Sequence, residues 1–340
     1  MRPNSLFVAA LCFLVAVPGA PTQELTKRGT FKGHKFPVDR TALSPDDKVL
    51  AAGGGNGTGG ELKLYDAAIG KEIAALPGYT SFLFSLVFSA DGKRLASGGY
   101  EQVQVWDMSS HKEIASFKDP GFGSIVALNR DGTKVAAVGS NQAKLWEVAS
   151  GRELSFFRHH VPISGWLGAA FNRDLAILAA RNYQEIDLWD TATCKEKVTL
   201  SEHRGEVCCM AWSADDKTLI ASSTRYKGKD NKWHGDLKLW DVLSGKERAT
   251  LPGPFGHIRV IAPSLDGKTL ALLDRPDLYA EFDLKLVDVD TGRQRVVAAP
   301  PTCSFLSTHF TSQGKLLVTG TSVDTLWLWE VALPKRGMKP

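Results

Sequence analysis

Two polar segments, residues 225–234 and 274–283, carry the side chains best suited to recognition. The first segment is basic and the second is rich in acidic residues. Aromatic and arginine side chains combine apolar area with a polar tip, and they are common at interaction hot spots. The candidate binding residues are Tyr226, Lys229, Trp233, His234, Arg275 and Tyr279. Two interpretations stay open: the segments form a recognition surface, or they pair with each other as solvated hairpins, which would contribute little stability.

The common signatures of catalysis are absent from the sequence. There is no Gly-x-Ser-x-Gly elbow, no His-Glu-x-x-His, no Cys-x-x-Cys, no Walker loop and no dinucleotide fingerprint. The glycine-rich stretch 53–60 lacks the Gly-Lys-Ser/Thr ending, so it predicts a flexible hairpin tip and not a phosphate cradle. His159 and His160 would point apart on an extended segment and make a poor metal pair. We therefore expect a non-enzyme without metal or cofactor.

A short apolar segment recurs along the chain, and it ends in an acid that follows an aromatic residue or, in one copy, a valine. The copies are separated by 41, 40, 43, 51, 47 and 42 residues. They end at Tyr65-Asp66, Trp106-Asp107, Trp146-Glu147, Trp189-Asp190, Trp240-Asp241, Val287-Asp288 and Trp329-Glu330. A polar turn such as Ser89-Ala-Asp-Gly-Lys93 precedes each copy, and Asp-Gly between apolar runs is a strong hairpin signal. Each unit thus predicts four short antiparallel strands.

These features resemble the WD-repeat β-propeller family, in which a period of about forty residues ends in Trp-Asp. Gly33-His34 matches the Gly-His pair of that family. The resemblance implies an all-β, seven-bladed propeller of four-stranded antiparallel blades over residues 25–333. It also implies that an N-terminal strand at 26–32 completes the last blade and leaves no open sheet edge.

The same resemblance gives several residues a structural role. The tryptophans should pack between blades, and the histidines should join buried hydrogen-bond networks. These residues are His34, Trp106, Trp146, Trp189, His203, Trp240 and Trp329. Most blades lack a histidine at the matching position, so we expect apolar packing to hold the blades together.

The first residues predict a secretory signal peptide at 1–19, because Arg2 precedes an apolar run at 6–17 that is too short to span a bilayer. A linker at 20–24 and a tail at 334–340 would flank the propeller. With this leader, the chain resembles exported WD-repeat proteins of bacterial type. The expected location is therefore the periplasm or the medium. We also expect the protein to be a monomer and to have no membrane span.

Charge and cysteine content narrow the choice of partner. Lys and Arg number 41 and Asp and Glu 37, a net charge of +4 without a basic run, so nucleic acid is not implied. Whether Cys208, Cys209 or Cys303 form disulfides is open, although neighbouring strand residues point to opposite faces, which favours free thiols.

Length variation locates the expected binding face. The distance from one Trp-equivalent to the next polar turn is 23 to 26 residues, whereas the distance from turn to Trp-equivalent ranges from 17 to 27. The extra residues fall between the second and third strands, in the segments 53–60, 225–235 and 274–283. Long connections on a rigid scaffold often carry binding sites. We expect a protein-binding scaffold; the alternative is a small-molecule or glycan binder, or a hydrolase, with its site at the channel mouth.

Overall fold

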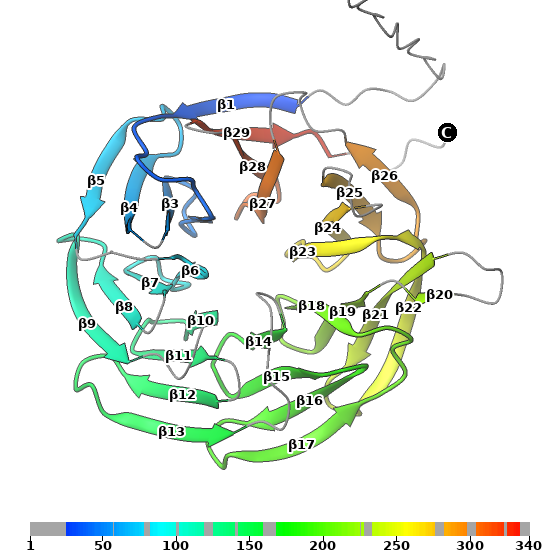
Figure 1. Ribbon diagram of the computed structural model, residues 1–340. Coiled ribbons are helices and arrows are strands. Elements are labelled where there is room, and N and C mark those ends of the chain that lie inside the picture. The colour runs from blue at the N-terminus through cyan, green and yellow to red at the C-terminus, as the bar shows by residue number, and fades with distance from the viewer. Residues whose placement is uncertain are drawn as a thin grey trace, which may run out of the picture.

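The structure is a computed structural model, and it describes most of the chain from residue 25 to residue 333. The described ranges are 25–56, 58–77, 82–99, 102–118, 125–139, 142–158, 168–224, 226–227, 233–275, 282–297, 304–322 and 325–333. These residues form seven antiparallel sheets arranged as blades around a central axis (Figure 1). The prediction of an all-β, seven-bladed propeller is therefore confirmed. The signal peptide prediction concerns residues outside the described ranges and stays a prediction.

Each blade has an inner strand a, then strands b and c, and an outer strand d. Blade 1 contains β2 (Arg40–Leu43), β3 (Val49–Asn56), β4 (Gly59–Asp66) and β5 (Glu72–Leu76). Blade 2 contains β6 (Ser85–Phe88), β7 (Arg94–Gly98), β8 (Gln102–Asp107) and β9 (Lys112–Lys118). Blade 3 contains β10 (Ile125–Leu128), β11 (Lys134–Val138), β12 (Gln142–Glu147) and β13 (Glu153–Arg158). Blade 4 contains β14 (Ala169–Phe171), β15 (Ile177–Asn182), β16 (Glu185–Asp190) and β17 (Lys195–Leu200).

The remaining blades follow the same order, but blade 5 has one additional short strand and blade 7 takes its outer strand from the N-terminal part of the chain. Blade 5 contains β18 (Val207–Trp212), β19 (Thr218–Ser223), β21 (Trp233–Asp241) and β22 (Lys246–Phe255), and the short β20 (Tyr226–Lys227) pairs with β21. Blade 6 contains β23 (His257–Pro263), β24 (Thr269–Arg275), β25 (Asp283–Asp288) and β26 (Gln294–Val297). Blade 7 contains β27 (Ser304–Phe310), β28 (Leu316–Ser322), β29 (Thr325–Val331) and, as its outer strand, β1 (Leu25–Phe31). No helix in this described part of the chain is long and apolar enough to cross a membrane.

Burial explains why the strand sequences differ by position in a blade. Strand b is covered by neighbouring blades on both faces, so β11 is almost wholly apolar and buried beyond its first residue. Strand d faces solvent on its outer side, so β9 is mostly exposed and buries Phe117. A strand that is buried on both faces reads as a continuous apolar run instead of an alternating one.

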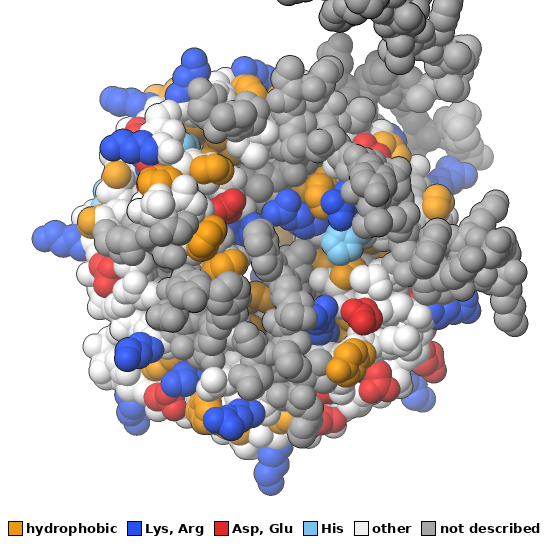
Figure 2. Space-filling view, viewed as in Figure 1, with side chains coloured by type: hydrophobic (Ala, Val, Ile, Leu, Met, Phe, Trp, Pro, Cys, Tyr) orange, Lys and Arg blue, Asp and Glu red, His pale blue; other side chains and the backbone are white. Residues whose placement is uncertain are grey.

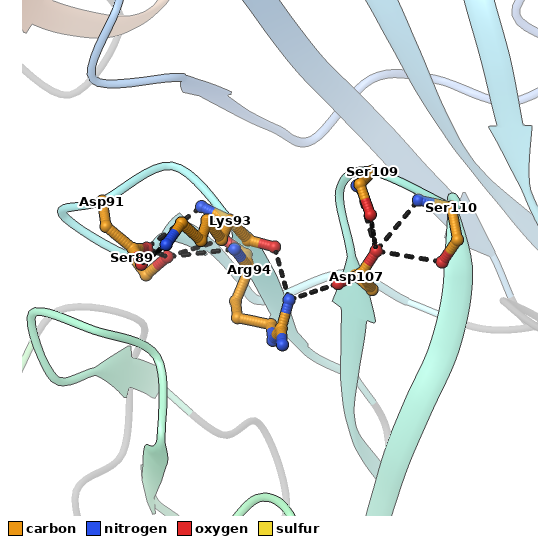
Figure 3. A network of polar contacts seen from close by, with 7 residues as sticks. All are labelled: Ser89, Asp91, Lys93, Arg94, Asp107, Ser109 and Ser110. Carbon is orange, nitrogen blue, oxygen red and sulfur yellow. Dashed lines mark hydrogen bonds and ion pairs between the residues drawn. The ribbon is translucent and has the colours of Figure 1, made fainter.

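In the polar turns, side-chain oxygens accept hydrogen bonds from backbone N–H groups and hydroxyl groups of the same turn. In blade 2, Ser89 Oγ donates to Asp91 Oδ1 at 2.6 Å, and the backbone N–H of Lys93 donates to the same oxygen at 3.0 Å (Figure 3). Asp107 accepts hydrogen bonds from Ser109 and Ser110 in the next turn and an ion pair from Arg94. These bonds hold the pKa of Asp107 well below its usual range. Such short local bonds fix turn geometry.

The glycine-rich stretch 53–60 corrects one prediction. It is not chiefly a flexible tip, because Val49–Asn56 and Gly59–Asp66 are paired strands up to the Asn56 and Gly59 positions. A Cβ at Gly54 would lie 2.0 Å from the carbonyl oxygen of Pro37. The stretch is therefore rich in glycine because the preceding chain runs directly across it.

The first and last strands of the ring pair with each other, as predicted. β1 runs antiparallel to β29, with Phe31 opposite Leu326 and Leu25 opposite Val331. Phe31 is fully buried and meets the ring of Tyr65 edge-on at 5.3 Å between centroids. One side chain thus joins the closing strand to blade 1.

We expect Phe31→Ala to lower the free energy of unfolding by about 3–5 kcal/mol, the usual cost of removing a buried aromatic ring. Thr26→Ala, at an exposed position of the same strand, is the matched control and should cost less than about 0.5 kcal/mol. Denaturant unfolding followed by tryptophan fluorescence measures both. Equal stability of the two variants would mean that β1 does not close the ring.

Candidate functional site

The two faces of the disc are made from different connections. Antiparallel strands place the starts of strand a, the ends of strand b and the starts of strand c on one face, which we call the hairpin face. The a–b and c–d turns lie on the opposite face, the turn face. Figure 2 shows a central hollow bordered by lysine and arginine side chains and a histidine. The candidate site is therefore sought at the inner strand ends of the hairpin face.

The first predicted binding segment extends the hairpin of blade 5. Tyr226 of β20 pairs with His234 of β21, and Lys227 pairs with Trp233. β20 lies at the outer rim of the ring in Figure 1. Three predicted residues therefore share one two-stranded extension, while Lys229 lies outside the described residues.

The second predicted segment, 274–283, is described at its two ends, residues 274–275 and 282–283. Asp274 and Arg275 are the last two residues of β24, and Tyr279 lies outside the described residues. Asp274 is fully buried, forms an ion pair with Lys285 at 2.6 Å and accepts the backbone N–H of Gly256 at 2.9 Å. The expectation that its charge serves either a loop pair or a recognition surface is therefore wrong for Asp274.

Arg275, in contrast, lies beside two residues that the sequence did not single out. Its Cζ is 5.3 Å from the ring centroid of Phe282, and the Cζ of Arg259 is 5.6 Å from the same centroid. Arg259 falls at a register shift between Ile258 and Val260, whereas Arg275 pairs with His257. A bulge of this kind redirects one side chain. It has no local sequence signal, which is why Arg259 was missed.

Among the described residues at this end of the inner strands, Arg40, Arg259 and Arg275 are accompanied by Asp39. Arg40 begins β2 on the same face, and its neighbour Asp39 interacts electrostatically with Arg40 and Arg259. Burial raises the pKa of Asp39, although the backbone N–H of Gly55 and both arginines oppose this shift. Burial also lowers the pKa of Arg259, and the charge of Arg275 lowers it further, against the attraction of Asp39. The channel mouth at blade 6 is thus a positively charged, partly desolvated region.

Two blades carry the buried histidine network that the resemblance implied. In blade 5, His203 Nδ1 is 2.6 Å from Asp236 Oδ1, and Trp240 Nε1 donates toward His203 Nε2 at 3.4 Å. The backbone N–H of Arg204 donates to Asp236 Oδ2 at 3.0 Å. Burial alone would raise the pKa of Asp236, but these hydrogen bonds outweigh it and hold the pKa below its usual value. Asp236 was missed in the sequence because this residue lies four positions before Trp240, outside the repeated Trp-Asp ending.

Blade 1 builds an equivalent network from different residue types. His34 Nδ1 lies 3.0 Å from Glu61 Oε1, and His34 Nε2 lies 2.8 Å from the Tyr65 hydroxyl. Burial lowers the pKa of His34, although Glu61 opposes this shift. Burial also raises the pKa of the Tyr65 hydroxyl. Tyrosine thus replaces tryptophan as the partner of the histidine.

The predicted structural tryptophans are all buried. Trp106 and Trp240 belong to apolar clusters that contain residues of the preceding blade. Trp146 stacks on Phe117 at 5.0 Å and Trp189 on Phe157 at 5.5 Å between ring centroids. Trp329 packs with Leu284, Leu286 and Val297 of blade 6.

A serine and a histidine meet at the seam between blades 7 and 1. Ser307 Oγ lies 2.9 Å from His309 Nε2 and 2.7 Å from Thr319 Oγ1. Thr41 Oγ1 of blade 1 lies 3.0 Å from Thr319 Oγ1. Burial lowers the pKa of His309 to about 4, so the imidazole is a weak base near neutral pH. Within the described ranges no hydrogen bond or ion pair joins His309 to a carboxylate, and the group fits a structural hydroxyl cluster.

The described residues also contain no group of three His, Cys, Asp or Glu side chains that could hold a metal ion. Cys194, Cys208 and Cys209 are free thiols, and Cys303 lies outside the described residues. Burial raises the pKa of Cys208 to about 11. A thiol with so high a pKa is a poor nucleophile.

Comparison with known proteins agrees with this architecture. Three segments, residues 25–66, 70–107 and 194–241, match the family described as WD domain, G-beta repeat. The chain is 28% identical over 280 residues to small ribosomal subunit protein RACK1 of Caenorhabditis elegans. The aligned region covers 79% of this chain and 82% of that protein. It is 25% identical over 168 residues to Protein SPA1-RELATED 4 of Arabidopsis thaliana, and that aligned region covers 47% of this chain and 19% of that protein. The chain therefore carries WD40 repeats and is distantly similar to RACK1.

We expect Asp236→Asn to lower the free energy of unfolding by about 1–3 kcal/mol, because the buried His203 and the Arg204 N–H lose a charged acceptor. Asp174→Asn is the control: Asp174 is 59% exposed and pairs with Arg130 at 2.8 Å, so its loss should cost less than about 1 kcal/mol. Chemical denaturation at neutral pH measures both. Equal losses of unfolding free energy in the two variants would show that the buried network of blade 5 contributes no more stability than an exposed ion pair.

Stability should fall as the pH drops from about 7 to about 5. The folded pKa of His309 is about 4, below the value of 6.5 for an unperturbed histidine. The unfolded state therefore binds a proton first, and stability is lost as the pH falls from 6.5 toward 4, by at most about 1.4 kcal/mol per pH unit for one proton. His309→Asn should flatten this slope.

The control for this measurement is His111→Asn, because asparagine tolerates the positive φ of 55° at that position. The free energy of unfolding is measured by denaturant titration at each pH. An unchanged slope in His309→Asn, or the same flattening in His111→Asn, would contradict the assignment.

Proposed function

We propose that this WD40-repeat propeller is a non-catalytic scaffold that binds a partner protein or peptide on its hairpin face. The observation that carries the proposal is the extension of blade 5, where β20 pairs with the first residues of β21 beyond the four-stranded blade. The other face is made of short turns closed by local hydrogen bonds, such as those of Ser89 and Asp91. The additional chain length lies where a partner can reach it.

The rigid ring supports this role on energetic grounds. Binding costs free energy when loops and side chains become ordered, and a scaffold that already fixes their positions reduces that cost. The β20–β21 pairing fixes the backbone of Tyr226, Trp233 and His234. Aromatic residues placed in this way are suitable anchors for a partner.

The relatives are consistent with a scaffold. RACK1 is named as a small ribosomal subunit protein, so that relative is part of a larger assembly. The alternative, a small-molecule, glycan or hydrolytic site at the channel mouth, would need polar groups suited to that chemistry. The described mouth carries Arg40, Arg259 and Arg275 with Asp39 instead of a pair of facing carboxylates. We therefore place protein binding first.

We expect shortening of the blade 5 extension to abolish capture of the partner. Residues 226–234 are replaced by Asn-Gly, and the variant is compared with the intact propeller in affinity capture from the native source. The captured protein is then purified and rebound, and its Kd should rise at least tenfold, about 1.4 kcal/mol.

The control is Leu243→Ser in the turn face of the same blade, where the side chain is 98% exposed. It should leave the Kd unchanged. Binding that survives the shortened hairpin and fails in Leu243→Ser would move the interface to the turn face and overturn the proposal.

A further inference from the structure

We propose that the channel mouth at blade 6 binds a glutamate or aspartate carboxylate of the partner through Arg259 and Arg275, with Phe282 as the apolar wall. The inference rests on the proposed function and names the chemistry of the partner segment. It assigns a second contact region, at the centre of the hairpin face, in addition to the extension at the rim.

The backbone brings the two arginines together from adjacent strands. Arg275 is the last residue of β24 and pairs with His257, two residues before Arg259 on β23. The register shift around Arg259 takes it out of the regular alternation of side chains. Both guanidinium groups then lie within 6 Å of the Phe282 ring, at 5.6 and 5.3 Å. The sheet itself thus fixes the spacing of the two cations.

The aromatic ring partly compensates two cations that would otherwise repel each other. A guanidinium over an aromatic ring is attracted by the negative face of the ring, and more strongly when the contact is dry. Phe282 is half-buried and packs against the apolar core between blades 6 and 7. The ring is therefore a fixed wall, and the polar edges of the guanidinium groups are left to bind something else.

The acids that the structure describes near this pair also interact with other cations. Asp274 pairs with Lys285, and the charge of Lys285 also acts on Asp283. Asp39 acts on both Arg40 and Arg259. Arg275 Nε is buried without a hydrogen-bond partner among the described residues. A buried donor without a partner destabilises the protein, so an acceptor that reached this N–H would relieve that cost.

The shape of the donors favours a carboxylate on a peptide. A guanidinium presents a planar fork that matches a carboxylate with two parallel hydrogen bonds. The pair lies on an inner strand and a strand end of the hairpin face, where a side chain from a bound peptide can enter. The chain has a net charge of only +4 and no basic run, so a nucleic-acid backbone or a lipid surface would find no extended positive surface.

The test uses the whole propeller and a fluorescein-labelled peptide, Gly-Ser-Glu-Glu-Glu-Glu-Ser-Gly, with its glutamine counterpart as the neutral probe. Fluorescence anisotropy gives the Kd at about 50 and 150 mM salt, since screening weakens ionic contacts. The glutamate peptide should bind at least tenfold more tightly than the glutamine peptide. Arg259→Gln with Arg275→Gln should remove this preference.

The matched control removes two charges from the turn face, Arg152→Gln with Arg293→Gln, at two exposed positions. It should leave the Kd within twofold. Equal weakening by the two pairs would mean that net charge attracts the peptide, and this would overturn the proposal. Equal binding of the glutamate and glutamine peptides would overturn it as well.

Further variants separate folding from binding. Arg259→Lys with Arg275→Lys keeps the charge but removes the fork, and Phe282→Leu keeps the apolar wall but removes the ring; each should weaken binding two- to tenfold while circular dichroism shows a folded propeller. Normal affinity in both would contradict the assigned geometry. A phosphoserine peptide that binds through the arginines while the glutamate peptide does not would reassign the site to phosphate.

The outcome is distinguishable from that of the scaffold proposal. A partner that is lost on shortening 226–234 but kept by the double glutamine variant would leave the scaffold standing and refute the carboxylate site. A glutamate peptide that binds through Arg259 and Arg275 in a propeller that captures no partner would do the reverse.

Discussion

The propeller depends on the seams at which the third strand of each blade packs against the blade before it. Tyr65 packs on Leu326 and Leu328 of blade 7, Trp106 on Leu62 and Leu64 of blade 1, and the series continues around the ring. Each seam buries apolar surface that a single blade cannot cover alone. The last seam also includes β1, which supplies the outer strand of blade 7 and places Phe31 against Tyr65.

Polar bonding adds to these seams unevenly. Trp240 Nε1 donates to His203, which is held by Asp236, whereas Trp106 Nε1 is buried without a hydrogen-bond partner among the described residues. A buried donor without a partner costs free energy, so blade 2 must recover that cost from its apolar contacts. Trp106 is fully buried in such a cluster. Apolar packing is thus the common rule, and the histidine network is an addition in blades 1 and 5.

Periodic features of the fold could be read from the sequence, and features that depend on a single local distortion could not. The Trp-Asp endings and the polar turns repeat at a near-constant interval, so the number of blades followed from them, and the closing strand followed from the resemblance to WD-repeat propellers. The length argument also found the blade 5 extension. It failed at Asp274, because a charged residue in a long connection was taken as a loop residue when it ends a buried strand and neutralises Lys285. Arg259 and Phe282 were missed because a bulge and a ring contact leave no repeating signal.

Blade 6 handles buried charge in two contrasting ways. Asp274 and Lys285 neutralise each other inside the blade, with a backbone N–H from Gly256 completing the carboxylate's contacts. Breaking such a pair leaves an uncompensated charge, so this arrangement serves the fold. Arg259 and Arg275 instead share one aromatic ring, and among the described residues the carboxylate that acts on Arg259 is that of Asp39. One cation of blade 6, Lys285, is thus neutralised by a buried carboxylate, whereas Arg259 and Arg275 keep much of their positive charge uncompensated. Their charge attracts anions to the channel mouth, and this attraction favours an anionic partner.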